Sequence, residues 1–185
     1  MPVSRTPPVI HEVRRVDDGA GRVVEELDLE FSNGERRRYR RLLAQGAGAV
    51  IVVAMPDPDT VLLVREYAAG MGRYELGPVK GAIDPGEGIE EAANRELMEE
   101  AGFGARELVV LRELAQSPSY MTHTAHVVLA RELYPQSLPG DEPEPMEQVR
   151  WPIARLGELV EREDVSDGRA IAALFIVREW LASRR

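Results

Sequence analysis

The chain has 185 residues, 44% of them hydrophobic and 30% charged, which suits one soluble domain with a small appendage. Its formal net charge of −9 argues against nucleic acid as the main partner, and the absence of cysteine excludes disulfide bonds and thiolate metal sites. The N-terminal MPVSRTPPVI lacks the apolar segment of a secretory signal, and no apolar run approaches a membrane span. We therefore expect a cytoplasmic protein without a membrane partner.

The sequence pattern over residues 1–45 predicts a small antiparallel β unit. Strand patterns occupy residues 9–16, 21–32 and 35–44, and the Asn33-Gly34 pair between the last two is typical of a hairpin turn. A unit of this size is too small to be stable alone. We expect it to need the main domain or a second subunit, which favours a homodimer.

Residues 46–185 predict the main domain, in which strands alternate with helices as in the α/β class. The continuous apolar run at 47–55 is typical of a strand buried on both faces. A loop and a helix are predicted within residues 81–103. Asp167 is a candidate N-cap for the final helix. Further strands are predicted at 60–67, 108–114, 126–130 and 149–151, and a further short helix at 153–162.

The stretch GAIDPGEGIEEAANRELMEEAGF, from Gly81 to Phe103, is a loop rich in glycine and proline followed by an acidic helix. Glu96 faces both Glu99 and Glu100 on that helix, and each like-charge pair at this spacing costs about 0.2–0.5 kcal/mol. Two of these acids also lie in the last turn, where the helix dipole disfavours negative charge. A divalent cation reverses the balance, because Mg²⁺ prefers hard oxygen ligands. The spacing therefore predicts a metal site.

Two other charged residues of this stretch are expected to be structural. Glu87 lies near the start of the helix, where the free N–H groups and the positive dipole end favour an acid. Arg95 follows two turns later and can pair with Glu87, which would lock the loop onto the helix.

The stretch resembles the Nudix box, the motif of hydrolases that cleave nucleoside diphosphates linked to another moiety. Phe103, at the final aliphatic position, is a mild departure. The resemblance implies a Nudix α/β/α sandwich with a mixed sheet, in addition to the N-terminal β unit. The matching positions are Gly81, Glu87, Arg95, Glu96, Leu97, Glu99, Glu100 and Gly102.

Other segments are similar to the ADP-compounds hydrolase branch of that family, the NudE type, which is related to ADP-ribose pyrophosphatases. They include LDLEFSNG, YELG, SPSY and GDEPEP. Members of this branch act on ADP-ribose, dinucleotides such as NADH and diadenosine polyphosphates, and are typically dimeric. Pro118 resembles a marker of the ADP-ribose enzymes and Tyr120 one of the diadenosine polyphosphate enzymes, which suggests a mixed substrate range. A Glu usual after that Pro in the ADP-ribose enzymes is missing here.

The resemblance also implies roles for individual residues. Metal ligands are Glu96, Glu99 and Glu100, with the backbone carbonyl of Lys80 as a further ligand. The catalytic residues are Glu99 and the pair Glu142 and Glu144, one of which deprotonates the attacking water, while Glu147 is a further candidate. The substrate contacts are Arg65, which can hold the diphosphate, Glu75 and Tyr120. The alternatives are a solvated strand end for Arg65, a solvated acidic loop for Glu142 and Glu144, and a packed turn residue for Tyr120.

We therefore predict a pyrophosphohydrolase that uses Mg²⁺, or alternatively Mn²⁺, and cleaves the diphosphate of small nucleotide substrates. ADP-ribose, NADH and diadenosine polyphosphates would each release AMP. Two alternatives stay open, a nucleotide-sugar pyrophosphatase and a non-catalytic Nudix module that binds a nucleotide. The complete set of acids in the box favours an enzyme.

Overall fold

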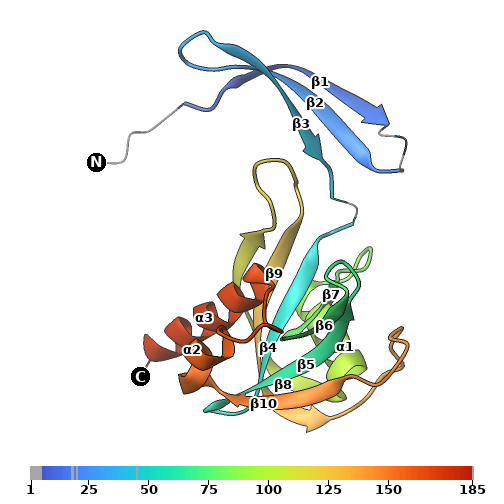
Figure 1. The fold of residues 1–185 in the computed structure, drawn as a ribbon, viewed down its shortest axis with the longest axis vertical. Helices are drawn as coiled ribbons and strands as arrows, with labels where there is room; N and C mark the ends of the chain where they lie inside the picture. Colours follow the sequence, from blue (N-terminus) through green and yellow to red (C-terminus); the bar gives the residue numbers. More distant parts are fainter. Residues whose placement is uncertain (1–5, 18, 20, 45, 185) are drawn as a thin grey trace. The chain divides into compact units, whose positions relative to one another are not determined.

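The computed structural model describes residues 6–17, 19, 21–44 and 46–184 (Figure 1). The chain folds as two compact units. One unit comprises the described residues up to Ala44 together with Ala115–Thr124, and the other comprises Gly46–Leu114 with the chain from Ala125 onward. No helix in the described ranges is long and apolar enough to cross a membrane.

The first unit is a three-stranded antiparallel sheet, which confirms the predicted antiparallel β unit, and its strand order is β1-β2-β3. The turn between β2 and β3 needs a glycine, because Gly34 has a φ of 82° and its N–H donates to the carbonyl of Phe31 at 2.9 Å. Leu42 exchanges backbone hydrogen bonds with Tyr120 (2.8 Å) and Thr122 (3.0 Å), which joins the later segment to this sheet. The strands are β1 (Val9–Asp17), β2 (Val23–Glu30) and β3 (Arg36–Leu42).

The second unit is built on a seven-stranded mixed sheet, which confirms the predicted fold class. Its main path runs β10-β5-β4-β9-β8, with β6 paired to β5 and β7 paired to β4. β4 runs parallel to β9 and antiparallel to β5 and β7. The strands are β4 (Ala49–Asp57), β5 (Thr60–Ala68), β6 (Arg73–Gly77), β7 (Val79–Ala82), β8 (Phe103–Ala115), β9 (Thr124–Pro135) and β10 (Glu147–Pro152).

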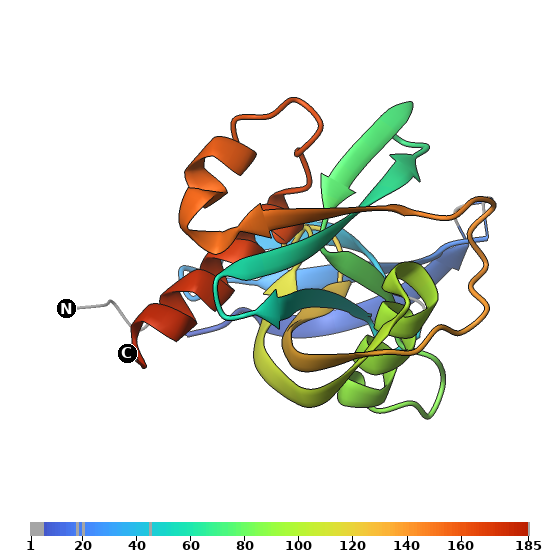
Figure 2. The same cartoon turned by 90° about the horizontal axis from the view of Figure 1, so that it is seen from below.

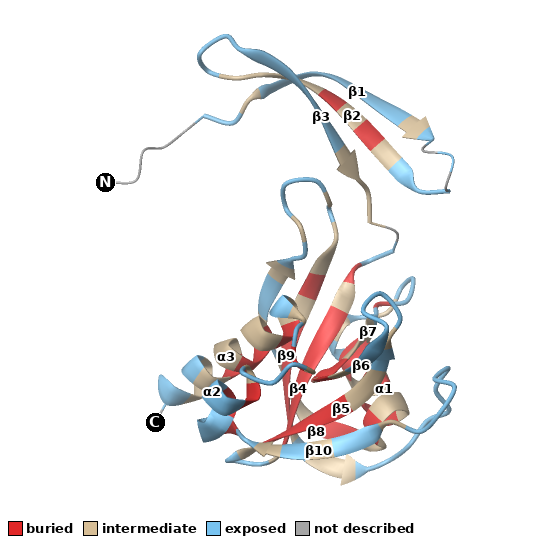
Figure 3. Ribbon diagram, in the orientation of Figure 1, coloured by how far each residue is buried: buried red, intermediate tan, exposed pale blue. Residues whose placement is uncertain are grey.

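Helices cover both faces of this sheet, α1 (Ile89–Ala101) on one and α3 (Gly168–Ala182) on the other (Figures 1 and 2). Buried residues concentrate in the central strands of this sheet (Figure 3). The alternation of side chains along β5 separates two cores. Val61 and Leu63 pack in the cluster that contains the buried residues of α3, whereas Leu62 and Val64 pack in the cluster that contains those of α1.

The last helices differ partly from the sequence prediction. The expected helix over 153–162 is a single 3₁₀ turn, Ile153–Arg155, followed by the one-turn helix α2 (Leu156–Leu159). The predicted N-cap of α3 is confirmed, because the side chain of Asp167 accepts a hydrogen bond from the backbone N–H of Arg169 at 2.9 Å.

Candidate active site

Local sequence explains where α1 begins and ends. The backbone N–H of Gly88, its N-cap, donates to the Glu91 carboxylate at 2.9 Å. Gly102 ends the helix with a φ of 69°, a left-handed conformation that glycine adopts without strain. The helix buries a stripe of apolar side chains against the sheet, and the acids of interest border that stripe. The stripe includes Ala92, Ala93, Leu97 and Ala101.

Arg95 clamps the loop before α1 onto the helix, as predicted. Its Nε and Nη2 each donate to the Glu87 carboxylate at 2.9 Å, and Nη2 also donates to the carbonyl of Ala82 at 2.9 Å. Its Nη1 donates to Glu96 at 2.8 Å and to Glu99 at 3.0 Å. The hydrogen bonds from Arg95 lower the pKa of Glu87 below its usual range, although burial opposes this.

Burial dominates the environment of Glu100 and Glu96 on α1. Burial raises the pKa of Glu100 to about 8, while the charge of Lys80 acts in the opposite direction. Burial likewise raises the pKa of Glu96, opposed by its bonds to Arg95. Gly81 leaves room for Glu96, because a Cβ at this position would lie 2.0 Å from the Glu96 carboxyl carbon.

Residues from two other elements join this cluster. Glu66 of β5 forms an ion pair with Lys80 Nζ, and its charge acts on Glu100. In the loop between β9 and β10, burial raises the pKa of Glu142, and the charges of Glu66 and Asp141 add to this effect. Glu66 and Asp141 were not among the residues predicted for the site. The period of two along β5 was the available signal for Glu66, since it shares a face with Leu62 and Val64.

The two glutamates proposed as the base differ in their surroundings. The Tyr74 hydroxyl donates a hydrogen bond to the Glu144 carboxylate. Tyr74 also meets Tyr67 edge to face, with ring centroids 5.4 Å apart. Glu142, by contrast, has no hydrogen-bonding partner in the described part of the chain and lies within the influence of Glu66, Asp141 and Lys80.

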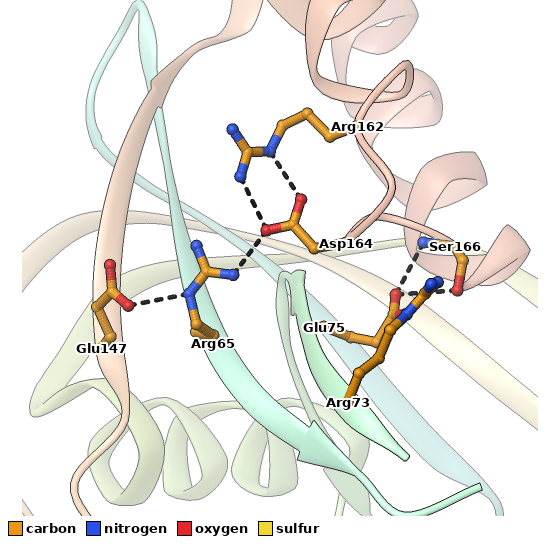
Figure 4. A network of polar contacts seen from close by, with 7 residues as sticks. All are labelled: Arg65, Arg73, Glu75, Glu147, Arg162, Asp164 and Ser166. Carbon is orange, nitrogen blue, oxygen red and sulfur yellow. Dashed lines mark hydrogen bonds and ion pairs between the residues drawn. The ribbon is translucent and has the colours of Figure 1, made fainter. Parts of the chain in front are cut away.

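Arg65 lies on the α3 face of β5, on the opposite face from Glu66. Its Nε donates to Glu147 at 2.9 Å and its Nη1 donates to Asp164 at 2.6 Å (Figure 4). Arg162 holds the same Asp164 carboxylate through two hydrogen bonds of 2.8 Å. The structure therefore brings Arg65 together with the loop before α3 rather than with the acids of α1.

Glu75 forms a separate group of contacts with Arg73 and Ser166, which Figure 4 also draws. Its carboxylate accepts hydrogen bonds from the N–H and the hydroxyl of Ser166, both at 2.9 Å, and from Arg73 Nε at 2.6 Å. Burial opposes its ionisation, but these hydrogen bonds prevail and lower the pKa of Glu75.

Tyr120 lies in the first unit, with 55% of its surface exposed. It lines a shallow cavity of about 350 Å³, which carries arginines and no acid in its wall. The other lining residues are Arg22, Val24, Arg40, Arg41 and Leu42.

Comparison with known families matches residues 45–174 to the NUDIX domain and residues 8–41 to the NudE-type Nudix hydrolase N-terminal domain. The chain belongs to the Nudix hydrolase family. It is similar to ADP compounds hydrolase NudE of Escherichia coli (strain K12), with 50% identity over 98% of this chain and 97% of that protein. ADP-ribose pyrophosphatase of Bacillus subtilis (strain 168) is 30% identical over 80% of each chain. A crystal structure of an ADP compounds hydrolase superposes with a TM-score of 0.85 at 49% identity, covering 98% of this chain and 97% of that one.

Nudix hydrolases generally need a divalent metal, and the residues of this Nudix box fit one. The partly buried Glu100 carboxylate has a raised pKa, as expected of an acid that lacks a sufficient counter-charge, and Gly81 leaves the room that the Glu96 carboxylate occupies. Hard carboxylate oxygens are also the ligand type that Mg²⁺ and Mn²⁺ take. As the side chains stand, no three His, Cys, Asp or Glu residues among those described are grouped closely enough to hold an ion. Glu96 and Glu99 are both bonded to Arg95 instead.

Proposed function

We propose that this Nudix hydrolase cleaves the diphosphate of ADP compounds and releases AMP. The observation that carries the proposal is that Glu100 of α1 and Glu142 of a separate loop share Glu66 and Lys80 as charged neighbours. The E. coli relative, named for hydrolysis of ADP compounds, supports this substrate class. ADP-ribose, NADH and diadenosine polyphosphates are the proposed small-molecule substrates, and the cytoplasm is the proposed location.

In the proposed mechanism, Glu96, Glu99 and Glu100, with the carbonyl of Lys80, hold Mg²⁺, or alternatively Mn²⁺. When bound, such an ion neutralises charge on the diphosphate and makes water more acidic. Glu142 accepts the proton of the attacking water. Burial suits it to this role, because it raises the pKa of Glu142 toward the working pH. The water oxygen bonds to one phosphorus as the bridging P–O bond breaks, so ADP-ribose yields AMP and ribose 5-phosphate.

The other residues predicted for the site have different roles in the proposed mechanism. Glu144 is held by Tyr74, which leaves Glu142 as the base. Arg65 and Glu75 secure the loop before α3, and any contact they make with substrate is from that side of the sheet. Tyr120 contributes an exposed aromatic ring in the first unit, suited to stacking on a nucleobase.

The first unit supports a homodimer. On one face of its sheet, Val13 and Tyr39 lie directly opposite Leu27 in the pairing register. Val13 is 47% exposed and Tyr39 is 45% exposed, so an apolar surface is left uncovered. A dimer buries it, and light scattering after size-exclusion chromatography is expected to give twice the chain mass. Val13→Glu should shift the protein toward monomer.

A second candidate function is nucleotide-sugar hydrolysis. The GDP-mannose pyrophosphatase of Salmonella choleraesuis (strain SC-B67) is 29% identical over 80% of this chain and 82% of that protein. The Nudix box is expected in enzymes of both kinds, so the two candidate functions must be distinguished by the substrate that the protein hydrolyses.

Product analysis tests the proposal. The protein is incubated with Mg²⁺ and ADP-ribose, NADH, diadenosine triphosphate or GDP-mannose, beside a Glu100→Gln variant whose fold is checked by thermal melting. We expect AMP from the three ADP compounds and no turnover by the variant. Preferential release of GMP from GDP-mannose would favour the second candidate, and no turnover of any substrate by folded wild type would refute the hydrolase proposal.

A further inference from the structure

Lys80 is the single lysine of the chain, and every other member of its 23 Lys and Arg residues is arginine. An arginine presents a planar fork suited to carboxylates, whereas a lysine presents a compact charge on a flexible stem. The chain therefore departs from its uniform use of arginine at one position. That position lies among the carboxylates of the candidate active site.

Lys80 is surrounded by acids from three elements. Its Nζ forms an ion pair with Glu66 of β5, and its backbone N–H faces the Glu100 carboxylate of α1 at 3.4 Å. The charge of Lys80 also acts on Glu142 in the loop before β10. The side chains of Lys80 and Glu66 are 34% and 30% exposed, so solvent and ligands can reach the pair.

Arg95 and Lys80 both border the acids of α1, and they differ in the number of hydrogen bonds they donate. Arg95 donates five hydrogen bonds, to Glu87, Glu96, Glu99 and the carbonyl of Ala82. Lys80 Nζ has Glu66 as its single partner within the ranges that the structure describes. Lys80 is therefore the cation that can turn to an incoming anion without dismantling the Arg95 clamp.

A diphosphate that enters this cluster meets several carboxylates of its own sign. A divalent ion offsets part of that repulsion, and a nearby ammonium offsets more of it. We propose that the Lys80 ammonium contacts the diphosphate of the substrate and that Glu66 positions it for this contact. The inference rests on the proposed function, because it takes a nucleoside diphosphate as the ligand.

The single lysine permits a direct test on the intact protein. Reductive methylation with ¹³C-formaldehyde labels Lys80 and the N-terminal amine, and the signal that is absent from Lys80→Arg identifies Lys80. We expect α,β-methylene-ADP, a diphosphate that resists hydrolysis, to shift the Lys80 signal saturably in the presence of Mg²⁺ and to leave the N-terminal signal in place. Binding by calorimetry without a Lys80 shift would overturn the proposal.

Variants separate a ligand contact from a structural role. Lys80→Gln should weaken α,β-methylene-ADP binding about ten-fold or more, since charge-assisted hydrogen bonds are lost. Lys80→Arg should restore part of that affinity. Mn²⁺ binding without nucleotide, followed by electron paramagnetic resonance, should stay equal or become tighter in Lys80→Gln, because a positive charge leaves the carboxylate cluster. Equal losses of Mn²⁺ and nucleotide affinity would show that Lys80 only supports the fold of the site.

Arg155→Gln is the matched control. It removes one positive charge from an exposed ion pair with Glu158, and we expect unchanged binding of both ligands. The test also distinguishes the two proposals. If the Lys80 signal shifts on binding of α,β-methylene-ADP but ADP compounds are not hydrolysed, this inference holds and the proposed hydrolysis is refuted. If ADP compounds are hydrolysed but the Lys80 signal does not shift, the proposed hydrolysis holds and this inference is refuted.

Discussion

The hydroxyl of Tyr74 on β6 donates a hydrogen bond to the carboxylate of Glu144, and so ties the acidic loop 136–146 to the strand beside it. The same loop is fixed at its other end, where the N–H of Leu138 donates to the carbonyl of Met98 on α1 at 3.2 Å. The loop is thus anchored on both α1 and β6. Glu142 lies between these two anchors, which defines its position relative to the acids of α1.

Tyr74→Phe should loosen this loop and slow the reaction. The change removes the hydroxyl and keeps the ring contact with Tyr67, so one anchor is lost without a cavity. We expect faster amide hydrogen exchange over residues 136–146 and AMP release slowed by about three- to ten-fold, in proportion to one lost charge-assisted hydrogen bond. Tyr67→Phe is the control and should change neither quantity. Unchanged exchange in Tyr74→Phe would show that the loop does not depend on this bond.

Gly81→Ala should impair metal binding more than stability. The added Cβ would lie 2.0 Å from the Glu96 carboxyl carbon, and a flexible carboxyl group can move aside more readily than backbone. We expect Mn²⁺ affinity to fall about ten-fold, as for loss of a well-placed ligand contact, with a melting temperature close to wild type. Gly157→Ala, at a glycine with no atom within 4 Å of an added Cβ, should alter neither. Normal Mn²⁺ affinity in Gly81→Ala would contradict the assignment of Glu96 as a ligand.

Glu87→Gln should destabilise the loop before α1. The substitution weakens both Arg95 bonds to this side chain, which is only 15% exposed, and leaves part of the guanidinium charge uncompensated. We expect the free energy of unfolding to fall by about 1–2 kcal/mol in urea titrations. Glu113→Gln, an exposed residue of β8, is the control with no expected change. If both substitutions lowered the free energy of unfolding equally, the change in net charge would explain the loss, and the Arg95–Glu87 hydrogen bonds would not.

Acid should weaken the network around Asp164. The Arg162 guanidinium, together with Arg65, holds the pKa of Asp164 well below its usual range, although burial opposes this. A depressed folded-state pKa adds stability above the unfolded value of about 3.9, and that stability is lost as the pH falls toward the folded value. Asp164→Asn should therefore be less stable than wild type by about 1–2 kcal/mol at pH 7, a difference that narrows below about pH 4.

Urea unfolding at pH 7 and pH 3 measures this effect. Glu163→Gln, at the neighbouring exposed position, should match wild type at both values. If the deficit of Asp164→Asn were the same at pH 3 as at pH 7, the ionised carboxylate would not be its source.

The sequence was informative wherever a local pattern has one physical solution. The Asn33-Gly34 turn, the apolar run of β4, the Asp167 cap and the pairing of Glu87 with Arg95 follow from short-range rules, and all are present. The mixed sheet between helices was also predicted. The short strands β6 and β7 were missed because their residues pair with β5 and β4, and such pairing leaves no trace in a local pattern.

The candidate site was harder to predict where two neighbouring residues point to opposite faces. Arg65 was predicted to bind phosphate. The neighbouring Glu66 is the residue whose side chain lies on the α1 face of β5 and pairs with Lys80. The contacts of Arg65 with Asp164 span 99 positions of the sequence, so no local rule foresees them.

The hairpin segment Ala115–Thr124 belongs to the first unit although it lies deep within the sequence of the second. The chain therefore passes between the units at three places, near residues 45, 115 and 125. A chimera that exchanges only the N-terminal residues would mismatch Leu42 with Tyr120 and Ala44 with Thr122, which are hydrogen-bonded here. In a chimera, the N-terminal strands and residues 115–124 should therefore be exchanged together.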